Sequence, residues 1–116
     1  MSKIINIRKK NELIAEFLNL PILPYNRRWD YLMLAVEKIE QLNYRVTINF
    51  NNCYIETYTG NLSGQLEEEV IVEENMCNSK IFAVWKTIID FIELIPRDKY
   101  GVLKIRPFIH ESQIIT

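Results

Sequence analysis

The sequence contains few of the residues that mark disordered, fibrous or disulfide-rich proteins. Its 116 residues include 3 Gly, 4 Pro and 2 Cys, whereas 48% are hydrophobic and 25% are charged. This composition excludes a collagen-like or a disordered chain. The length suits one compact domain and is too short for two. We expect a single domain over residues 11–109, between a basic N-terminal tail (residues 1–10) and a C-terminal tail (residues 110–116).

The sequence also lacks a long apolar run and a cysteine motif. The longest nearly apolar stretch, IFAVWKTIIDFIELI, is interrupted by Lys86, Asp90 and Glu93, which argues against a membrane span. The first ten residues have neither the apolar core nor the small-residue cleavage site of a signal peptide. Two cysteines outside a Cys-x-x-Cys pair do not indicate a secreted scaffold or a zinc site. We expect a cytoplasmic protein with no membrane partner, in which Cys53 and Cys77 are small buried side chains.

No motif for catalysis or for a cofactor is present. The single histidine, His110, has no Cys or Ser motif close to it, so no nucleophile–base pair is indicated. The glycines are spaced neither as a phosphate-binding loop nor as a dinucleotide fingerprint. The glutamates between residues 67 and 74 alternate between the two faces of a strand, whereas a metal site needs converging ligands. We expect no enzymatic activity, no cofactor and no metal.

The net charge of −1 shows no overall excess of cations for binding nucleic acid. The distribution is uneven, because residues 1–10 carry four cations without an acid and residues 97–106 carry four cations and one acid. Residues 56–74 carry six glutamates without a cation. A mixed solvated surface is the simplest interpretation. Basic contact surfaces near the two ends of the chain are the alternative.

Apolar residues recur at helical spacing in three segments. Asn11 is a candidate cap of a helix that ends near Leu20, and Asn26 of a second helix that ends near residue 42, where Asn43 can adopt a left-handed conformation. Ser79 is a candidate cap of a third helix, from Lys80 to about Leu94. The apolar loop between the first two helices, residues 21–25, is expected against the core. The helical residues expected in the core are Trp29, Leu32, Met33, Val36, Ile39, Ile81, Phe82, Trp85, Ile88, Ile89 and Ile92.

Alternation of apolar and polar residues predicts strands between the second and third helices. Residues 44–50 and 53–58 form a hairpin in this prediction, with Phe50 on the buried face and Asn51-Asn52 as the turn. A flexible loop at residues 60–64 precedes a third strand at residues 69–73, and residues 102–105 are a candidate fourth strand. The predicted fold class is α+β, a two-to-three-layer sandwich in which three helices cover an antiparallel sheet.

A partner surface must use side chains outside the predicted core. The six tyrosines either contribute to such a surface or line the sheet with their hydroxyl groups in water, and the sequence leaves both possibilities open. Arginine can bind carboxylate or phosphate groups through two hydrogen bonds, and tyrosine can stack on a base. The candidate partner-binding residues are Arg27, Arg28, Arg45, Tyr54, Lys9, Lys10, Lys104 and Arg106.

Several segments occur in an order that resembles small phage and prophage proteins of the "phage ABA sandwich" group, known from phages of Bacteroidota. These segments are NELIAEFL at 11–18, YNRRWDYLM at 25–33, VEKIE at 36–40, CYIE at 53–56 and SKIFAVW at 79–85 running on to FIE at 91–93. In that group a Tyr-x-x-x-Trp-Asp-x-Leu-Met helix start precedes a hairpin, and a Ser-Lys-Ile helix follows. The resemblance covers about residues 11–94 and departs at the N-terminus, at Leu34, where proline is common, and after Pro96. It offers no catalytic residues to carry over.

The resemblance implies a phage or mobile-element protein that acts by binding in the host bacterial cell. The leading expectation is an anti-CRISPR protein that binds a host CRISPR effector nuclease, with or without its guide RNA, through a polar patch. One alternative is a sponge that sequesters a cyclic-nucleotide immune signal in a preformed pocket, in which case a homodimer could form the site. Another is a phage structural or regulatory protein without a defence role. For an anti-CRISPR protein we expect removal of residues 1–10 to weaken inhibition while the thermal midpoint changes by only a few degrees.

Overall fold

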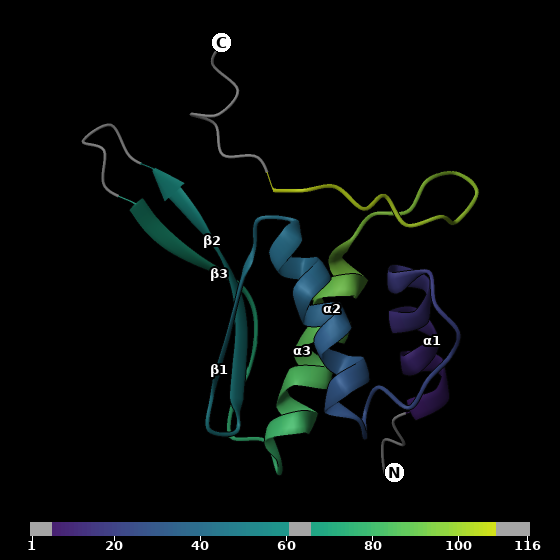
Figure 1. Cartoon of the computed structure of the whole chain (residues 1–116). Helices are drawn as coiled ribbons and strands as arrows, with labels where there is room; N and C mark the ends of the chain where they lie inside the picture. The colour runs from purple at the N-terminus through teal and green to yellow at the C-terminus, as the bar shows by residue number, and fades with distance from the viewer. Residues whose placement is uncertain (1–5, 61–65, 109–116) are drawn as a thin grey trace, which may run out of the picture.

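The protein has an α+β fold with one antiparallel sheet and three helices (Figure 1). The computed structural model describes residues 6–60 and 66–108, with only the backbone for residues 58–60 and 66–68. The loop predicted at residues 60–64 lies largely outside the described residues, as does His110. The elements are α1 (Ile7–Leu18), α2 (Trp29–Gln41), β1 (Arg45–Asn49), β2 (Asn52–Gly60), β3 (Leu66–Glu74) and α3 (Lys80–Leu94).

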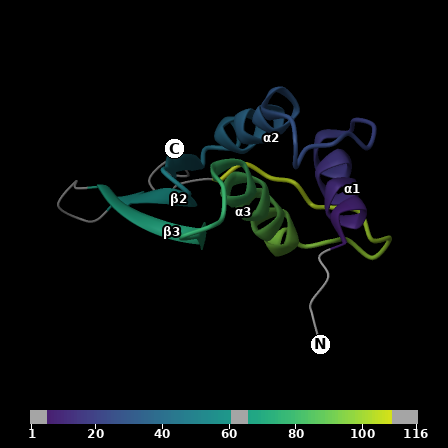
Figure 2. The ribbon, with the colours of Figure 1, turned by 90° about the horizontal axis from the view of Figure 1, so that it is seen from below.

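These elements form three layers, which confirms the predicted sandwich of sheet and helices. The strand order is β1-β2-β3, and both neighbouring pairs are antiparallel. Helix α3 packs on β2 and β3, α2 packs on β1, and α1 packs against α2 and α3 on the side away from the sheet (Figure 2). All three helices begin at the bottom of Figure 1, and residues 95–108 cross the opposite end. No helix within the described ranges has the length and apolar character needed to cross a membrane.

Helix α1 begins earlier than the sequence predicted. Asn6, and not Asn11, is its N-cap, and the Asn6 side chain accepts a hydrogen bond of 3.1 Å from the backbone N–H of Lys9. The predicted N-terminal tail is therefore wrong for residues 7–10, which form the first turn of α1. Asn11 is instead a buried residue within this helix. Removing residues 1–10 would thus delete part of a packed element.

The start of α2 also differs from the prediction. Arg28 occupies the N-cap position without a capping side-chain hydrogen bond, while the predicted cap, Asn26, accepts a hydrogen bond from Asn11. Trp29, which was expected in the core, is 40% exposed because it is the first residue of the helix and the buried stripe starts only at Leu32. The end of α2 agrees with the prediction, since Asn43 has a φ of 70°.

The β1–β2 hairpin closes one position before the predicted turn. Asn49 pairs with Asn52, so Phe50 and Asn51 form the turn. Phe50 therefore leaves the sheet and is 78% exposed, which contradicts its predicted burial. Between β2 and β3 the register shifts at Ile55/Glu56, and Ile71 is the residue of β3 left without a partner.

Helix α3 lies at the centre of the core, and its predicted cap is confirmed. The Ser79 hydroxyl accepts a hydrogen bond of 3.2 Å from the backbone N–H of Phe82, and Thr87 donates to the carbonyls of Ala83 and Cys53, which joins α3 to β2. The predicted burial of Cys53 is confirmed, whereas Cys77 is only half-buried. The fully buried hydrophobic residues include Ile14, Phe17, Tyr25, Leu32, Ala35, Ile39, Cys53, Ile55, Ala83, Val84, Ile88 and Ile89.

The predictions for the two connecting segments had different outcomes. The predicted fourth strand is absent from the described residues, where this segment makes a single bridge between Arg97 and Leu103. The Asp98 carboxylate accepts hydrogen bonds from the backbone N–H groups of residues 100 and 102, which folds the segment into a local loop instead of a strand. The loop at residues 21–25 does pack against the core as predicted, because Tyr25 is fully buried and Leu23 packs on the core, although Ile22 is 48% exposed.

Candidate functional site

The eight residues predicted to bind a partner lie in different parts of the molecule. Lys9, Lys10, Arg27 and Arg28 belong to the first turn of α1 and to the segment before α2, at the bottom of Figure 1. Tyr54 lies within β2 and Arg45 begins β1. Lys104 and Arg106 belong to the segment that crosses the opposite end of the helices. The structure therefore contains two separate candidate sites and not one patch.

Three of the predicted cations are held by carboxylates of the same chain. The Lys10 Nζ lies 3.1 Å from an oxygen of Glu93. The Arg28 guanidinium donates two hydrogen bonds, of 3.1 and 2.9 Å, to Asp30. The Arg45 Nε lies 3.6 Å from the buried carboxylate of Glu56. These side chains stabilise local structure, and we do not place them at the centre of a binding surface.

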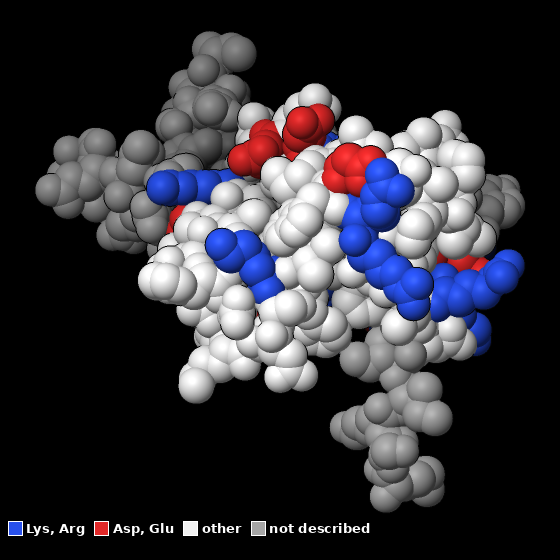
Figure 3. All heavy atoms as spheres, turned by 60° about the horizontal axis from the view of Figure 1, so that its bottom comes forward, with Lys and Arg blue, Asp and Glu red and all other residues white. Residues whose placement is uncertain are grey.

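Three other cations at the bottom of Figure 1 remain available for a partner. We call them the basic end, and they are Lys9, Arg27 and Lys80. All three are exposed, and none makes an ion pair with the residues that the structure describes. The helices all begin here, and the first turns of α1 and α3 contain no acidic residue, so the helix dipoles add positive potential. Figure 3 brings this part of the molecule forward and shows Lys and Arg side chains following one another beside an area with few charges.

Two exposed apolar side chains, Phe50 and Met76, stand at the same end of the molecule. We call this pair the apolar tip, and its members are 78% and 92% exposed. The backbone N–H of Met76 donates to Asn52 at 2.6 Å, and that of Cys77 donates to the Asn51 carbonyl at 3.1 Å, which ties the two loops together. The exposure of Phe50 and Met76 was not predicted from the sequence. The asparagines at positions 51 and 52 indicated a turn near Phe50 but not that its side chain faces solvent.

The backbone of the apolar tip adopts an unfavourable conformation. Phe50 has a φ of 54° and Met76 a φ of 53°. This left-handed region disfavours bulky side chains and costs roughly 1–3 kcal/mol per residue. Glycine would avoid that cost in both loops. The chain therefore presents two large apolar groups to solvent where both exposure and backbone conformation are unfavourable.

Asn11 connects the basic end to the core. Its side-chain amide donates to Asn26 at 2.9 Å, and its carbonyl oxygen accepts a hydrogen bond of 2.8 Å from the indole N–H of Trp85. We call these two hydrogen bonds of Asn11 the buried junction. Because Asn26 directly precedes Arg27, the junction fixes the segment that carries Arg27 against α1 and α3. The sequence suggested a helix cap at Asn11, whereas the structure makes it a buried positioning residue.

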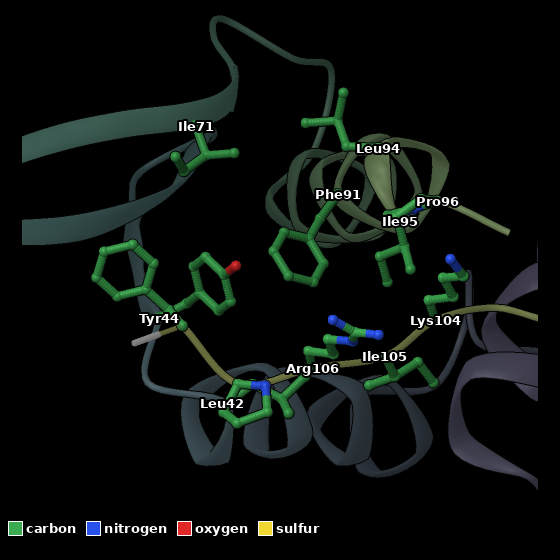
Figure 4. A pocket seen from close by; sticks show the side chains of 12 residues that line it. Leu42, Tyr44, Ile71, Phe91, Leu94, Ile95, Pro96, Lys104, Ile105 and Arg106 are labelled. Carbon is green, nitrogen blue, oxygen red and sulfur yellow. The ribbon is translucent and has the colours of Figure 1, made fainter. Parts of the chain in front are cut away.

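A pocket of about 310 Å³ lies at the opposite end of the molecule (Figure 4). Three aromatic rings meet at its wall, where the ring centroid of Tyr44 lies 4.9 Å from that of Phe91 and 5.8 Å from that of Phe108. Burial raises the pKa of the Tyr44 hydroxyl, which keeps it neutral and able to donate a hydrogen bond. The lining residues are Leu42, Tyr44, Ile71, Phe91, Leu94, Ile95, Pro96, Lys104, Ile105, Arg106, Pro107 and Phe108.

Metal-binding clusters and titratable groups with shifted pKa values are two further features that can mark a functional site. The described residues include no group of three His, Cys, Asp or Glu side chains that could hold a metal ion. A carboxylate with a strongly raised pKa, Glu74, lies outside both sites. A hydrogen bond with Asp90 and partial burial raise the pKa of Glu74 to about 7, while Lys86 opposes this shift. This cluster joins β3 to α3, and we interpret it as structural.

Comparisons with protein-family models, with curated proteins and with solved structures find no match to this chain.

Proposed function

We propose that this chain is a non-catalytic inhibitor of bacterial immunity, encoded by a phage or another mobile element, that binds a host CRISPR effector together with its guide RNA. The contact surface in this proposal consists of the basic end and the apolar tip. The observation that supports it is that cations without an ion pair among the described residues and exposed apolar side chains with an unfavourable backbone occur at the same end of the fold. The choice of a CRISPR effector among possible partners comes from the resemblance to small phage proteins.

The chemistry of this surface suits a complex of protein and RNA. The guanidinium of Arg27 can bind a phosphate of the guide RNA through two hydrogen bonds, and Lys9 and Lys80 can add attraction to the backbone. Phenylalanine, methionine and arginine are enriched at protein interfaces, where a few buried side chains supply most of the binding energy. Phe50 and Met76 would fill apolar pockets of the effector in this proposal.

The pocket supports the alternative of a cyclic-nucleotide sponge less well. A nucleobase needs hydrogen-bonding groups that face its edges, because a polar group buried without a partner loses binding energy. The side chains lining the pocket offer the hydroxyl of Tyr44 and two cations, and the rest are apolar. We therefore keep the effector complex as the proposed function and treat nucleotide binding as an outcome that an experiment can reveal.

The proposal is tested by DNA cleavage and co-purification with a panel of guide-loaded CRISPR effector nucleases. We expect stoichiometric inhibition of one effector and recovery of a stable complex. The double variant Phe50→Gly/Met76→Gly removes both apolar anchors and relieves the unfavourable backbone, so any loss of inhibition cannot be attributed to unfolding. The double variant Lys9→Glu/Arg27→Glu should also lose inhibition, whereas Lys99→Glu, an exposed change far from this end, should not.

Three results would count against the proposal. Inhibition by none of the effectors and no effector in a pull-down from host lysate would refute the function. Inhibition that persists in both double variants would refute the surface. Recovery of a phage virion protein instead would favour a structural role, and catalytic turnover of RNA, DNA or a cyclic nucleotide would exclude a non-catalytic inhibitor.

A further inference from the structure

We propose that the pocket of Figure 4 binds an amphiphilic organic anion, with the apolar body of the ligand inside the pocket and its carboxylate or phosphate at Lys104 and Arg106. This inference does not depend on the proposed function, because the pocket lies at the end of the molecule opposite to the basic end.

The body of the pocket is apolar and is assembled from several elements. Ile71 comes from the irregular position of β3, Phe91 and Leu94 from the last turns of α3, and Leu42 from the end of α2. Leu94 is 59% exposed and Ile71 is 36% exposed, so apolar area remains uncovered at this wall. An apolar ligand would remove that area from water, which favours binding.

The charge at the pocket has one sign. Lys104 and Arg106 are exposed, and the twelve lining residues contain no Asp or Glu. Arg97, a cation of the same segment, illustrates the contrast, because it donates hydrogen bonds of 2.9 and 2.8 Å to Glu16. Figure 4 shows the Arg106 side chain between Leu42 and Phe91, and the Lys104 amine beside Ile95. A ligand anion can therefore supply the carboxylate or phosphate that the lining does not.

Two backbone N–H groups of the pocket are already bonded within the fold. The N–H of Phe108 donates to the Leu42 carbonyl at 2.7 Å, and the N–H of Lys104 donates to the Pro96 carbonyl at 2.8 Å. An aliphatic or aromatic body is therefore a better fit than a nucleobase, which needs several such groups. The ligand class is a fatty acid, an alkyl phosphate or an aromatic acid of similar size.

The test is calorimetric titration of the full chain with decanoate, decyl phosphate and decyltrimethylammonium, each below its micelle concentration, and with a cyclic dinucleotide. We expect both anions to bind with one site per chain, and the cation with the same alkyl chain to bind roughly tenfold weaker or not at all. The variants Lys104→Gln and Arg106→Gln should weaken binding of decanoate by about tenfold in combination. The matched control Lys99→Gln should bind as the wild type does. Leu94→Trp, at an exposed position of the wall, should fill the pocket and abolish binding.

Three outcomes would overturn this inference. Equal affinity for the decyl anion and the decyl cation would show that charge plays no part. Unchanged binding in Leu94→Trp, with thermal unfolding like that of the wild type, would place the ligand elsewhere. Tighter binding of the cyclic dinucleotide than of either alkyl anion would identify a nucleotide site and revive the sponge alternative.

Discussion

Replacing Asn11 by alanine tests the most unusual interaction of this fold. The change removes a hydrogen bond of 2.9 Å to Asn26 and one of 2.8 Å from the indole of Trp85. The indole is 1% exposed, so water cannot replace the lost acceptor. A net loss of about 1 kcal/mol for the bond to Asn26, together with about 1–3 kcal/mol for a buried donor left without a partner, predicts a destabilisation of roughly 2–4 kcal/mol. At roughly 4 °C per kcal/mol this lowers the Tm by about 8–16 °C.

Urea and thermal unfolding, followed by circular dichroism, measure this effect. Glu12→Ala is the matched control, because the next residue of α1 is exposed and makes only a surface ion pair with Arg8 at 3.5 Å. That pair is worth about 0.5 kcal/mol or less. The double-mutant cycle with Trp85→Phe should show a coupling energy above about 0.5 kcal/mol. A free energy of unfolding within about 0.5 kcal/mol of the wild type for Asn11→Ala would refute the buried junction.

Three further predictions concern titration, thiol reactivity and the N-terminus. Because the pKa of Glu74 is about 7 in the folded protein and 4.5 in a free side chain, the fold binds this proton more tightly than the unfolded chain. Stability should therefore rise as the pH falls through about 7, and Glu74→Gln should remove most of this dependence in urea titrations. Burial raises the pKa of Cys53 to about 11, so a thiol reagent followed by mass spectrometry should label Cys77 in the native state and Cys53 only after unfolding. Deleting residues 1–10 should lower the Tm by several degrees, and deleting residues 1–5 should not, because only the longer deletion removes the cap and first turn of α1.

Hydrophobic periodicity predicted the helices best where it extends over several turns. The cap of α3 at Ser79 agrees with the structure, as does the burial of Trp85, Ile88, Ile89 and Ile92. Ile81 and Phe82, which were also expected in the core, are only half-buried. The antiparallel hairpin and a third strand were predicted, whereas the pairing of β3 with β2 was not, and the structure extends β2 and β3 beyond the predicted ends. These elements are determined by local pattern and by burial of one face, and both can be recognised in the sequence.

The helix starts and the hairpin turn could not be predicted, because competing residues of the same type occur close together. Asn6, Asn11 and Asn26 are all suitable caps. Their choice depends on a contact with Trp85, which is 74 residues away from Asn11 in the sequence. In the hairpin, strand register and not turn propensity places Phe50 at the turn, where local preference alone would favour another residue.

The sequence identified several residues of the candidate sites, but it did not show which of them lie together in the fold. The sequence identified Lys9, Arg27, Lys104 and Arg106 as available cations, together with others that the fold pairs internally. Pairing depends on which carboxylate lies nearby in three dimensions, as with Glu16 and Arg97, which are 81 residues apart. The pocket could not be predicted from the sequence, because its walls come from α3, β3, the connection between α2 and β1, and the segment after α3.

Exposed cations are common on protein surfaces and do not by themselves indicate a binding site. The basic end is a candidate site because it lies at the same end of the molecule as the apolar tip. An unpaired lysine or arginine costs almost nothing in stability, and its presence requires no functional explanation. Phe50 and Met76 are different, because each places a large apolar group in water and holds its backbone at a φ that favours glycine. If they serve the fold, the variants Phe50→Gly and Met76→Gly will be less stable than the wild type and will bind the partner as the wild type does. If they serve a partner, the same variants will be more stable than the wild type and will bind the partner more weakly. Measuring stability and binding on the same two variants therefore separates a structural from a functional origin of the apolar tip.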